Sequence, residues 1–230
     1  MDTLRHELEQ IVSGDRVLDN ELWREIYGRD ASYFKIIPEA VVRPQTTEEV
    51  RRIMALATRR GLSVTFRTGG TSLSGQTVNK GIICELRNGW HRYEIRDGGK
   101  KIWFEPGLTA AQVNAYLKPH HCHIGPDPAS KSAAMMGGVL ANNSSGMEAG
   151  VRYNSYHTMA SIEFVLANGH QYNSGVEADH GRFREQEREL CKGLLEIRDT
   201  IMRNDRMRDK IVEKYKIKNV TGYGMNSFVD

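Results

Sequence analysis

TFRTGGTSLSGQ, residues 65–76, is the stretch of sequence that indicates the fold of this protein. It contains three glycines, five hydroxyl side chains, one arginine and no acidic residue, and it continues a strand-like run at 62–66. Successive glycines at positive φ turn their backbone N–H groups to one side and form a nest for an anion. We therefore predict positive φ at Gly69 and Gly70, and an anion-binding role for the glycine loop, the name used below for residues 67–76.

Two familiar phosphate-binding signatures do not occur in this loop. There is no Gly-x-Gly-x-x-Gly opening a helix, as in a Rossmann dinucleotide site, and no Gly-Lys-Ser/Thr, as in a P-loop. The chemistry still suits a phosphate, because Thr71, Ser72 and Ser74 add hydroxyl donors. Arg67 either adds positive charge or braces the loop. The alternative for an isolated Gly-Gly pair is an ordinary surface turn between two strands.

A second glycine-rich segment, GPDPASKSAAMMGGVLANNSSGMEAG, spans residues 125–150. Its presence favours one ligand held by both glycine segments over two surface turns that bind nothing. It combines a rigid Pro-Asp-Pro, a Gly-Gly pair at 137–138 and an Asn-Asn-Ser-Ser-Gly run at 142–146. Asparagine and serine supply donors and acceptors, and glycine lets the backbone approach a ligand closely. Two such segments, about seventy residues apart, fit one extended polar ligand.

Hydrophobic periodicity and turn residues predict a chain that mixes helices with strands and hairpins, which is typical of an α+β fold. A capping box of Thr46 and Glu49 begins one helix, which Gly61 ends. The Asn168-Gly169 pair predicts a two-residue hairpin turn. The buried stripe of the capped helix is predicted to be Val50, Ile53, Met54 and Ala57. Further predictions are helices at 4–12, 109–119 and 182–216, an apolar stripe at 22–26, and strands at 40–44, 62–66, 81–86 and 101–107.

Composition argues against several classes of function. The net charge of +3 over 230 residues is too small to indicate nucleic-acid binding, and no apolar run approaches the roughly 18 residues of a membrane-spanning helix. Cys84, Cys122 and Cys191 form no Cys-x-x-Cys, so no iron–sulfur or zinc motif is readable and a reducing compartment is indicated. Adjacent histidines in HHCH at 120–123 point in opposite directions in an extended chain and make a poor chelate. We therefore predict no metal, no nucleic acid, no transmembrane segment and a cytoplasmic location.

Six motifs together resemble a known family. They are VVRPQTTEEV at 41–50, VTFRTGGTSLSGQ at 64–76, EPG at 105–107, GPDPAS at 125–130, GGVLANNSSGM at 137–147 and VLANG at 165–169. In this order and spacing they resemble the FAD-binding domain of the vanillyl-alcohol-oxidase, or PCMH, type of flavoprotein. Within that superfamily the chain looks most like the D-lactate and D-2-hydroxyglutarate dehydrogenases, especially the large forms that are fused to an iron–sulfur part.

The resemblance implies two α+β subdomains that clasp an extended FAD, with a helical segment at 1–37 and the FAD-binding domain at 38–230. It places the FAD pyrophosphate on backbone N–H groups of the glycine loop. The implied cofactor-binding residues are Arg67, Thr68, Gly69, Gly70, Thr71, Ser72, Gly75, Gln76, Pro126, Asp127, Gly137, Gly138, Asn142, Ser145 and Gly146. Thr68 stands where many relatives have glycine. Thr71 occupies the place of a histidine that bonds FAD in some members, so non-covalent FAD is implied.

The resemblance also implies a flavin-dependent oxidoreductase that oxidises a D-2-hydroxy acid, such as D-lactate or D-2-hydroxyglutarate, and passes electrons to an acceptor. Two alternatives remain open: the FAD-binding module of another reductase, such as an enolpyruvyl-sugar reductase, and a non-catalytic nucleotide-binding domain. The Gly-Ser-Glu-Gly-Thr-Leu-Gly segment, substrate domain and iron–sulfur part of the large relatives have no counterpart in these 230 residues. We therefore expect an N-terminal fragment with little turnover, unknown catalytic residues, and any iron–sulfur cluster outside this chain. Peripheral membrane attachment of the full-length protein stays open.

Overall fold

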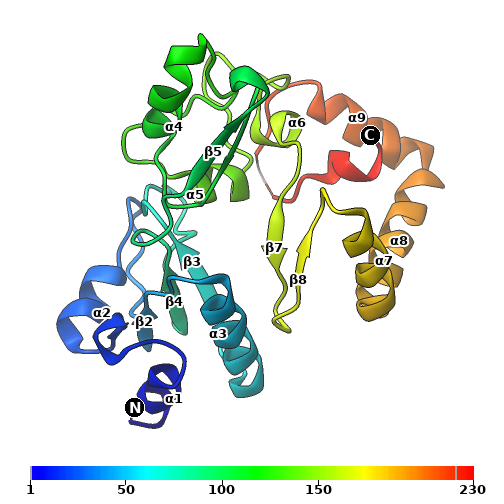
Figure 1. Ribbon diagram of the computed structural model, residues 1–230. Coiled ribbons are helices and arrows are strands. Elements are labelled where there is room, and N and C mark those ends of the chain that lie inside the picture. Colours follow the sequence, from blue (N-terminus) through cyan, green and yellow to red (C-terminus); the bar gives the residue numbers. More distant parts are fainter. Residues whose placement is uncertain (1, 221) are drawn as a thin grey trace. The chain divides into compact units, whose positions relative to one another are not determined.

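The computed structural model describes residues 2–220 and 222–230 (Figure 1). Contacts divide the chain into two units. Unit 1 comprises Met1–Ile124, Pro128–Ala141 and Val165–Gln171. Unit 2 comprises Gly125–Asp127, Asn142–Phe164 and Tyr172–Asp230. Helices and strands alternate irregularly along the chain, so the predicted α+β class is confirmed.

Unit 1 is built on a four-stranded sheet in the order β1-β2-β4-β3. The strands are β1 (Val17–Leu18), β2 (Ala40–Val42), β3 (Val64–Arg67) and β4 (Ile82–Glu85). β4 lies between β2 and β3 and runs parallel to both, whereas β1 is antiparallel to β2. Because β3 ends at Arg67, the glycine loop begins at the carboxyl edge of the parallel strands, where α/β sheets commonly hold ligands.

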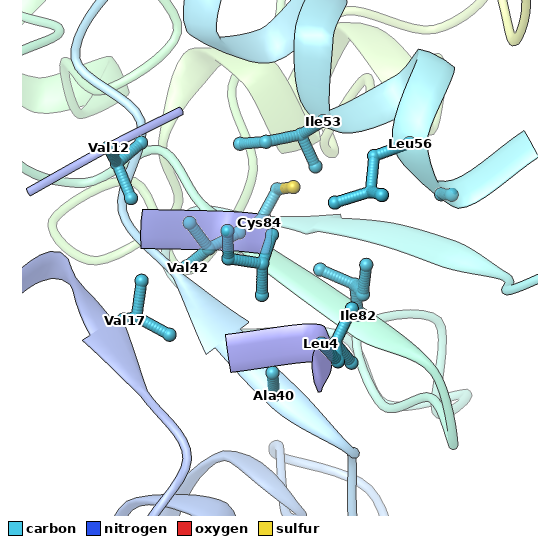
Figure 2. Packing of buried hydrophobic residues seen from close by; sticks show 11 residues of the cluster. Leu4, Val12, Val17, Ala40, Val42, Ile53, Leu56, Ile82 and Cys84 are labelled. Carbon is cyan, nitrogen blue, oxygen red and sulfur yellow. The ribbon is translucent and has the colours of Figure 1, made fainter. Parts of the chain in front are cut away.

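Helices cover both faces of this sheet, and its central strands are therefore buried on both sides. One face packs against α1 (Asp2–Glu9) and α3 (Thr47–Arg60), and Figure 2 shows the resulting apolar cluster around Val42 and Cys84. The other face packs against α2 (Glu21–Tyr27). The cluster on the α2 side consists of Leu18, Tyr27, Val41 and Ile83, with Trp23 packed against it.

Both ends of α3 are set by local sequence. The Thr46 hydroxyl accepts a hydrogen bond from the Glu49 N–H, and Gly61 ends the helix at a φ of +64°. The Glu49 carboxylate accepts from the Gln45 N–H at 2.6 Å and from the Arg16 guanidinium at 2.7 Å, so its main partner is an arginine distant in sequence. The buried residues of α3 are Val50, Ile53, Leu56 and Ala57; the predicted Met54 is only partly buried.

Glu49→Gln is expected to lower the free energy of unfolding at neutral pH by about 1–3 kcal/mol, because it removes a bidentate charged hydrogen bond. Burial by itself raises the pKa of Glu49, but hydrogen bonds from Arg16 and Gln45 outweigh it, so the folded-state pKa lies below 4.5. Such a carboxylate stabilises the fold above its unfolded-state pKa and loses that contribution as pH falls through the folded-state pKa. Thermal unfolding of both proteins across acidic pH measures this. Equal acid sensitivity of the two would contradict the prediction.

Unit 1 also contains a β-hairpin and two further helices. β5 (Tyr93–Arg96) pairs antiparallel with β6 (Lys101–Phe104). α4 (Ala110–Leu117) begins at a complete capping box between Thr109 and Gln112, as its sequence predicts for the cap. The apolar core between α4 and α5 (Met136–Ala141) consists of Leu108, Ala110, Val113, Leu117, Ala134, Met136 and Val139.

β7 (Glu163–Val165) and β8 (Gln171–Asn173) form the predicted two-stranded hairpin. Gly169 adopts a φ of +86°, as an Asn-Gly turn requires. The turn is longer than the predicted two residues, because the Leu166 N–H donates to the His170 carbonyl at 2.9 Å. Three residues, 167–169, therefore lie between Leu166 and His170, the last hydrogen-bonded pair of the hairpin.

The C-terminal part of unit 2 is helical. It contains α7 (Glu177–Gln186), α8 (Arg188–Met202) and α9 (Asp205–Tyr215), so the single helical stretch predicted at 182–216 is divided; the short α6 (Ser155–Thr158) precedes β7. α8 contacts both α7 and α9. Short 3₁₀ helices span Gly14–Arg16, Asp97–Gly99, Lys118–His120 and Met225–Phe228. Over residues 2–220 and 222–230, no helix has the length and apolar character needed to span a membrane.

Candidate functional site

Arg67 ties the start of the glycine loop to the segment that follows α2. Its guanidinium donates to the carbonyl of Tyr27 at 3.0 Å and to that of Arg29 at 2.7 Å, and it lies 5.1 Å from the centre of the Tyr27 ring. Burial lowers the pKa of Arg67, but an arginine in a protein stays protonated. These contacts favour bracing of the loop over direct charge donation as the function of Arg67. Its positive charge remains close to the loop.

Glycine is required at positions 69 and 70 for two different physical reasons. Gly70 adopts a φ of +65°, and a Cβ at this position would lie 2.8 Å from Nη2 of Arg67. Gly69 does not adopt positive φ, so that prediction is wrong. A Cβ on Gly69 would instead lie 2.4 Å from the carbonyl oxygen of Ala133. Close backbone packing, and not a left-handed conformation, therefore requires glycine at 69.

The loop leaves a run of backbone donors available. In the described part of the chain, the N–H groups of residues 68–73 donate no hydrogen bond to a protein acceptor. Residues 68–73 are partly or fully exposed, so their N–H groups are open to a ligand. Together with the charge of Arg67, they provide the environment that an anion requires.

Ser72 and Gln76 stabilise the loop internally. The Ser72 hydroxyl accepts from the N–H groups of Ser74 and Gln76 at 3.2 and 3.3 Å and donates to Oε1 of Gln76 at 3.0 Å. Gly75, at a φ of +73°, lies against the ring of Phe34, because a Cβ there would be 2.5 Å from Cδ2. These residues therefore set the shape of the loop.

The structure brings the glycine loop next to the start of α5 within unit 1. A Cβ on Gly137 would lie 3.3 Å from Cγ2 of Thr68, and one on Gly138 would lie 3.4 Å from Oγ1 of the same residue. Pro106 packs on the other side of Gly137, at 2.7 Å from that Cβ position. Two glycine segments that are far apart in sequence thus meet at Thr68, as a shared ligand would require.

Unit 2 holds the remaining predicted residues, Pro126, Asp127, Asn142, Ser145 and Gly146. Asp127 and Gly146 form a parallel bridge, and the Asp127 N–H donates to the carbonyl of Ser145. Gly146 adopts a φ of +110°, and a Cβ there would lie 1.9 Å from the Asp127 carbonyl oxygen. The Ser145 side chain is buried, and its Oγ has no hydrogen-bond partner in the described chain. An orphaned buried hydroxyl calls for a partner that the chain does not supply.

Sequence reasoning missed Asp30 and Thr77, which tie the glycine loop to the preceding segment. The Thr77 hydroxyl donates to Oδ2 of Asp30 at 2.9 Å, and the Asp30 Oδ1 accepts from the Ser32 N–H at 2.9 Å. The sequence signal was the Asp-x-Ser of an Asx turn, but its long-range partner has no local signature.

The side chains that suggested other chemistry are structural. No group of three or more His, Cys, Asp or Glu side chains within 2–220 and 222–230 is arranged to hold a metal ion. His121 of the HHCH run adopts a φ of +54° at the end of a 3₁₀ helix, and the His120 side chain packs against Gly99. Cys84 is fully buried in β4, where burial raises the pKa of its thiol and disfavours the reactive thiolate.

Comparison with known proteins identifies the family. A family model described as FAD binding domain matches residues 38–175, which is more than half of the chain. D-2-hydroxyglutarate dehydrogenase of Pantoea ananatis is 31% identical over 144 residues, covering 61% of this chain and 14% of the relative. Glycolate oxidase subunit GlcD of Escherichia coli K12 is 28% identical over 150 residues, covering 64% and 30%. D-lactate dehydrogenase of Archaeoglobus fulgidus is 30% identical over 138 residues, covering 59% and 30%. The chain thus spans less than a third of each of these relatives.

Solved structures share the fold. An alkyldihydroxyacetonephosphate synthase superposes with a TM-score of 0.65 at 20% identity, covering 78% of this chain and 36% of that chain. A p-cresol methylhydroxylase superposes with a TM-score of 0.62 at 18% identity, covering 77% and 37%. The chain therefore belongs to the FAD binding domain family, and its curated relatives include D-2-hydroxyglutarate and D-lactate dehydrogenases.

Proposed function

We propose that the glycine loop holds the FAD pyrophosphate and that the protein oxidises a D-2-hydroxy acid. The observation that carries the first part is the run of available backbone N–H groups at residues 68–73, above the charged Arg67. A pyrophosphate offers the acceptors that these donors lack, and hydrogen bonds to an ionised acceptor are stronger than neutral ones.

The remaining predicted residues fit the polar parts of the same cofactor. In unit 1, Thr68, Gly137 and Gly138 already lie together beside the loop. In unit 2, the buried Ser145 hydroxyl suits a polar atom of FAD. The lack of a side chain at Gly146 lets the Asp127 backbone lie close to Gly146. The proposed FAD-binding domain spans residues 38–230, after a helical segment at 1–37. The residues assigned to the site are Arg67, Thr68, Gly69, Gly70, Thr71, Ser72, Gly75, Gln76, Pro126, Asp127, Gly137, Gly138, Asn142, Ser145 and Gly146.

The substrate class follows from what the relatives act on. D-2-hydroxyglutarate, glycolate and D-lactate, named in the three relatives, are all 2-hydroxy carboxylates. When bound, FAD would supply the hydride-accepting chemistry for such a substrate, and the protein's part would be to hold and orient the cofactor. An electron acceptor is the second partner. Three free cysteines are in keeping with a cytoplasmic, reducing location.

The full-length protein tests this function. It should copurify with, or take up, FAD and show flavin absorption, and D-2-hydroxyglutarate, D-lactate or glycolate should bleach that absorption under anaerobic conditions. Bleaching by one of the D-enantiomers and not by its L-enantiomer supports the proposed substrate class. Flavin that is bound but bleached only by a nicotinamide donor would favour a reductase of the enolpyruvyl-sugar type. A protein that binds no flavin would overturn the proposal.

FAD is expected to be bound without a covalent link. Thr71 is exposed enough to meet a ligand, but a threonine hydroxyl is not activated to bond the flavin ring in the way that a histidine is. The second glycine segment, residues 125–150, contains no cysteine that could form such a bond. Acid precipitation of the flavin-loaded protein should leave all yellow colour in the supernatant. Colour that remains with the pellet would contradict this prediction.

A further inference from the structure

Residues Tyr27–Phe34, called here the bracing segment, contact the glycine loop at several points. They precede the region matched by the family model, which begins at residue 38. The segment leaves α2 at Tyr27 and runs along the loop before the chain enters β2. It contacts the loop at its beginning, its middle and its end.

Asp30 fixes the end of the loop. Its Oδ2 accepts from the hydroxyl and the backbone N–H of Thr77, at 2.9 and 3.4 Å, while Oδ1 accepts from the N–H of Ser32. Burial by itself raises the pKa of Asp30, but hydrogen bonds from Ser32 and Thr77 outweigh it and keep the pKa below its ordinary value. Asp30 is therefore an ionised acceptor at neutral pH, and its hydrogen bonds to Thr77 are charge-assisted.

The middle and the beginning of the loop are held by the same segment. The Ala31 N–H donates to the carbonyl of Gly70 at 3.2 Å, and the backbone carbonyls of Tyr27 and Arg29 accept from Arg67. The Phe34 ring lies against Gly75, although 54% of the surface of Phe34 remains exposed.

These contacts add little to the core. Ala31 and Phe34 are exposed, and Asp30 and Thr77 are only partly buried, so the segment beyond Tyr27 buries little apolar surface. A glycine-rich loop has high conformational entropy when it is free, and ordering it on ligand binding weakens the affinity. Contacts that order the loop in advance therefore strengthen ligand binding more than they strengthen the fold.

We propose that the bracing segment is part of the cofactor site, and that Asp30 and Thr77 are positioning residues that hold the glycine loop in its FAD-binding conformation. The inference rests on the proposed function of the loop. It extends the site to residues before the family-matched region, none of which needs to touch FAD. The ordering acts on the glycine loop, in which the N–H groups of residues 68–73 carry the proposed contact.

The test compares two substitutions of Thr77 in the full chain. Thr77→Val keeps the shape but removes the hydroxyl, and Thr77→Ser keeps the hydroxyl but removes the methyl group. We expect Thr77→Val to weaken FAD binding about 3-fold and Asp30→Ala about 10-fold, from the loss of charge-assisted hydrogen bonds. Thr77→Ser should restore nearly wild-type affinity. FAD titration by quenching of flavin fluorescence measures all three.

A second measurement needs no flavin. Hydrogen exchange of the apoprotein should become faster at the amides of Ala31, Ser74 and Gln76, whose N–H groups are hydrogen-bonded to the loop or within it. This is expected in Thr77→Val and Asp30→Ala, while exchange in the sheet of unit 1 stays unchanged. The matched control is Thr58→Val, which removes a threonine hydroxyl that donates to the Ala167 carbonyl at 2.6 Å, away from the loop. This control should leave both FAD affinity and loop exchange as in the wild type.

The outcomes separate this inference from the proposed function. If the wild type binds FAD and the Thr77 and Asp30 variants bind it equally well, the inference is overturned and the proposed function stands. If Thr58→Val weakens binding as much as Thr77→Val, the effect is general destabilisation and the inference is also overturned. If the wild type binds no FAD, the proposed function fails, and with it the cofactor role of the segment, whatever the exchange rates show.

Discussion

Gly70→Val is expected to weaken FAD binding by about 100-fold or more, because a β-branched residue in the left-handed region is strained by a few kcal/mol. The new Cβ would also lie 2.8 Å from Nη2 of Arg67, whose guanidinium is pinned by two backbone carbonyls and cannot move away freely. Relief of this clash requires the loop to change shape, so the N–H groups of residues 68–73 would no longer face one ligand. The fold itself should survive, because the loop lies outside the apolar clusters of unit 1.

Gly61→Val is the matched control for this change. Gly61 adopts a φ of +64°, nearly the same as Gly70, but nothing lies within 4 Å of a Cβ built there. The control should therefore lower the unfolding temperature through backbone strain and leave the FAD dissociation constant unchanged. FAD titration and thermal unfolding of both variants decide the matter. Wild-type affinity in Gly70→Val would mean that the glycine loop is an ordinary surface turn.

The second large effect is expected for Gly146→Ala in unit 2. A Cβ here would lie 1.9 Å from the Asp127 carbonyl oxygen, and the φ of +110° is already unfavourable for alanine. Because the clash is with backbone, the bridge between Asp127 and Gly146 must open, which would displace the neighbouring buried Ser145. We expect a loss of stability of about 4 kcal/mol or more, at the exceptional end for one substitution, together with loss of FAD binding.

Gly150→Ala provides the comparison four residues further along the chain. Gly150 also adopts positive φ, at +52°, but nothing lies within 4 Å of a Cβ at this position. This variant should lose only about 1 kcal/mol, the cost of an alanine in the left-handed region, and should bind FAD normally. Circular dichroism melting curves and FAD titrations would reveal the difference. Similar behaviour of the two variants would show that close packing against Asp127 is unimportant.

Local signals in the sequence predicted the elements that local contacts form. The Thr46 cap and the Gly61 stop of α3 were predicted correctly, because each acts within a few residues of its own position. The Asn168-Gly169 hairpin was predicted for the same reason. The strands β1 and β5 were missed: the first has two residues, and the second alternates without a strong apolar face. The position of β4 between β2 and β3 depends on long-range pairing, which has no local signature.

The glycine segments indicated the family from sequence alone, because their order and spacing are encoded in the chain, and the FAD binding domain model matches residues 38–175. Only the tertiary structure decided what individual residues in them do. Gly69 is required by the Ala133 backbone, Arg67 points into the protein toward Tyr27, and Asp30 holds Thr77 across 47 residues. Each of these contacts joins segments that are at least 40 residues apart in sequence, and the spacing of residues along a chain carries no information about which distant backbone atoms will meet. The sequence therefore indicated which loop is the candidate for holding the cofactor, and packing between distant segments decided how that loop is held.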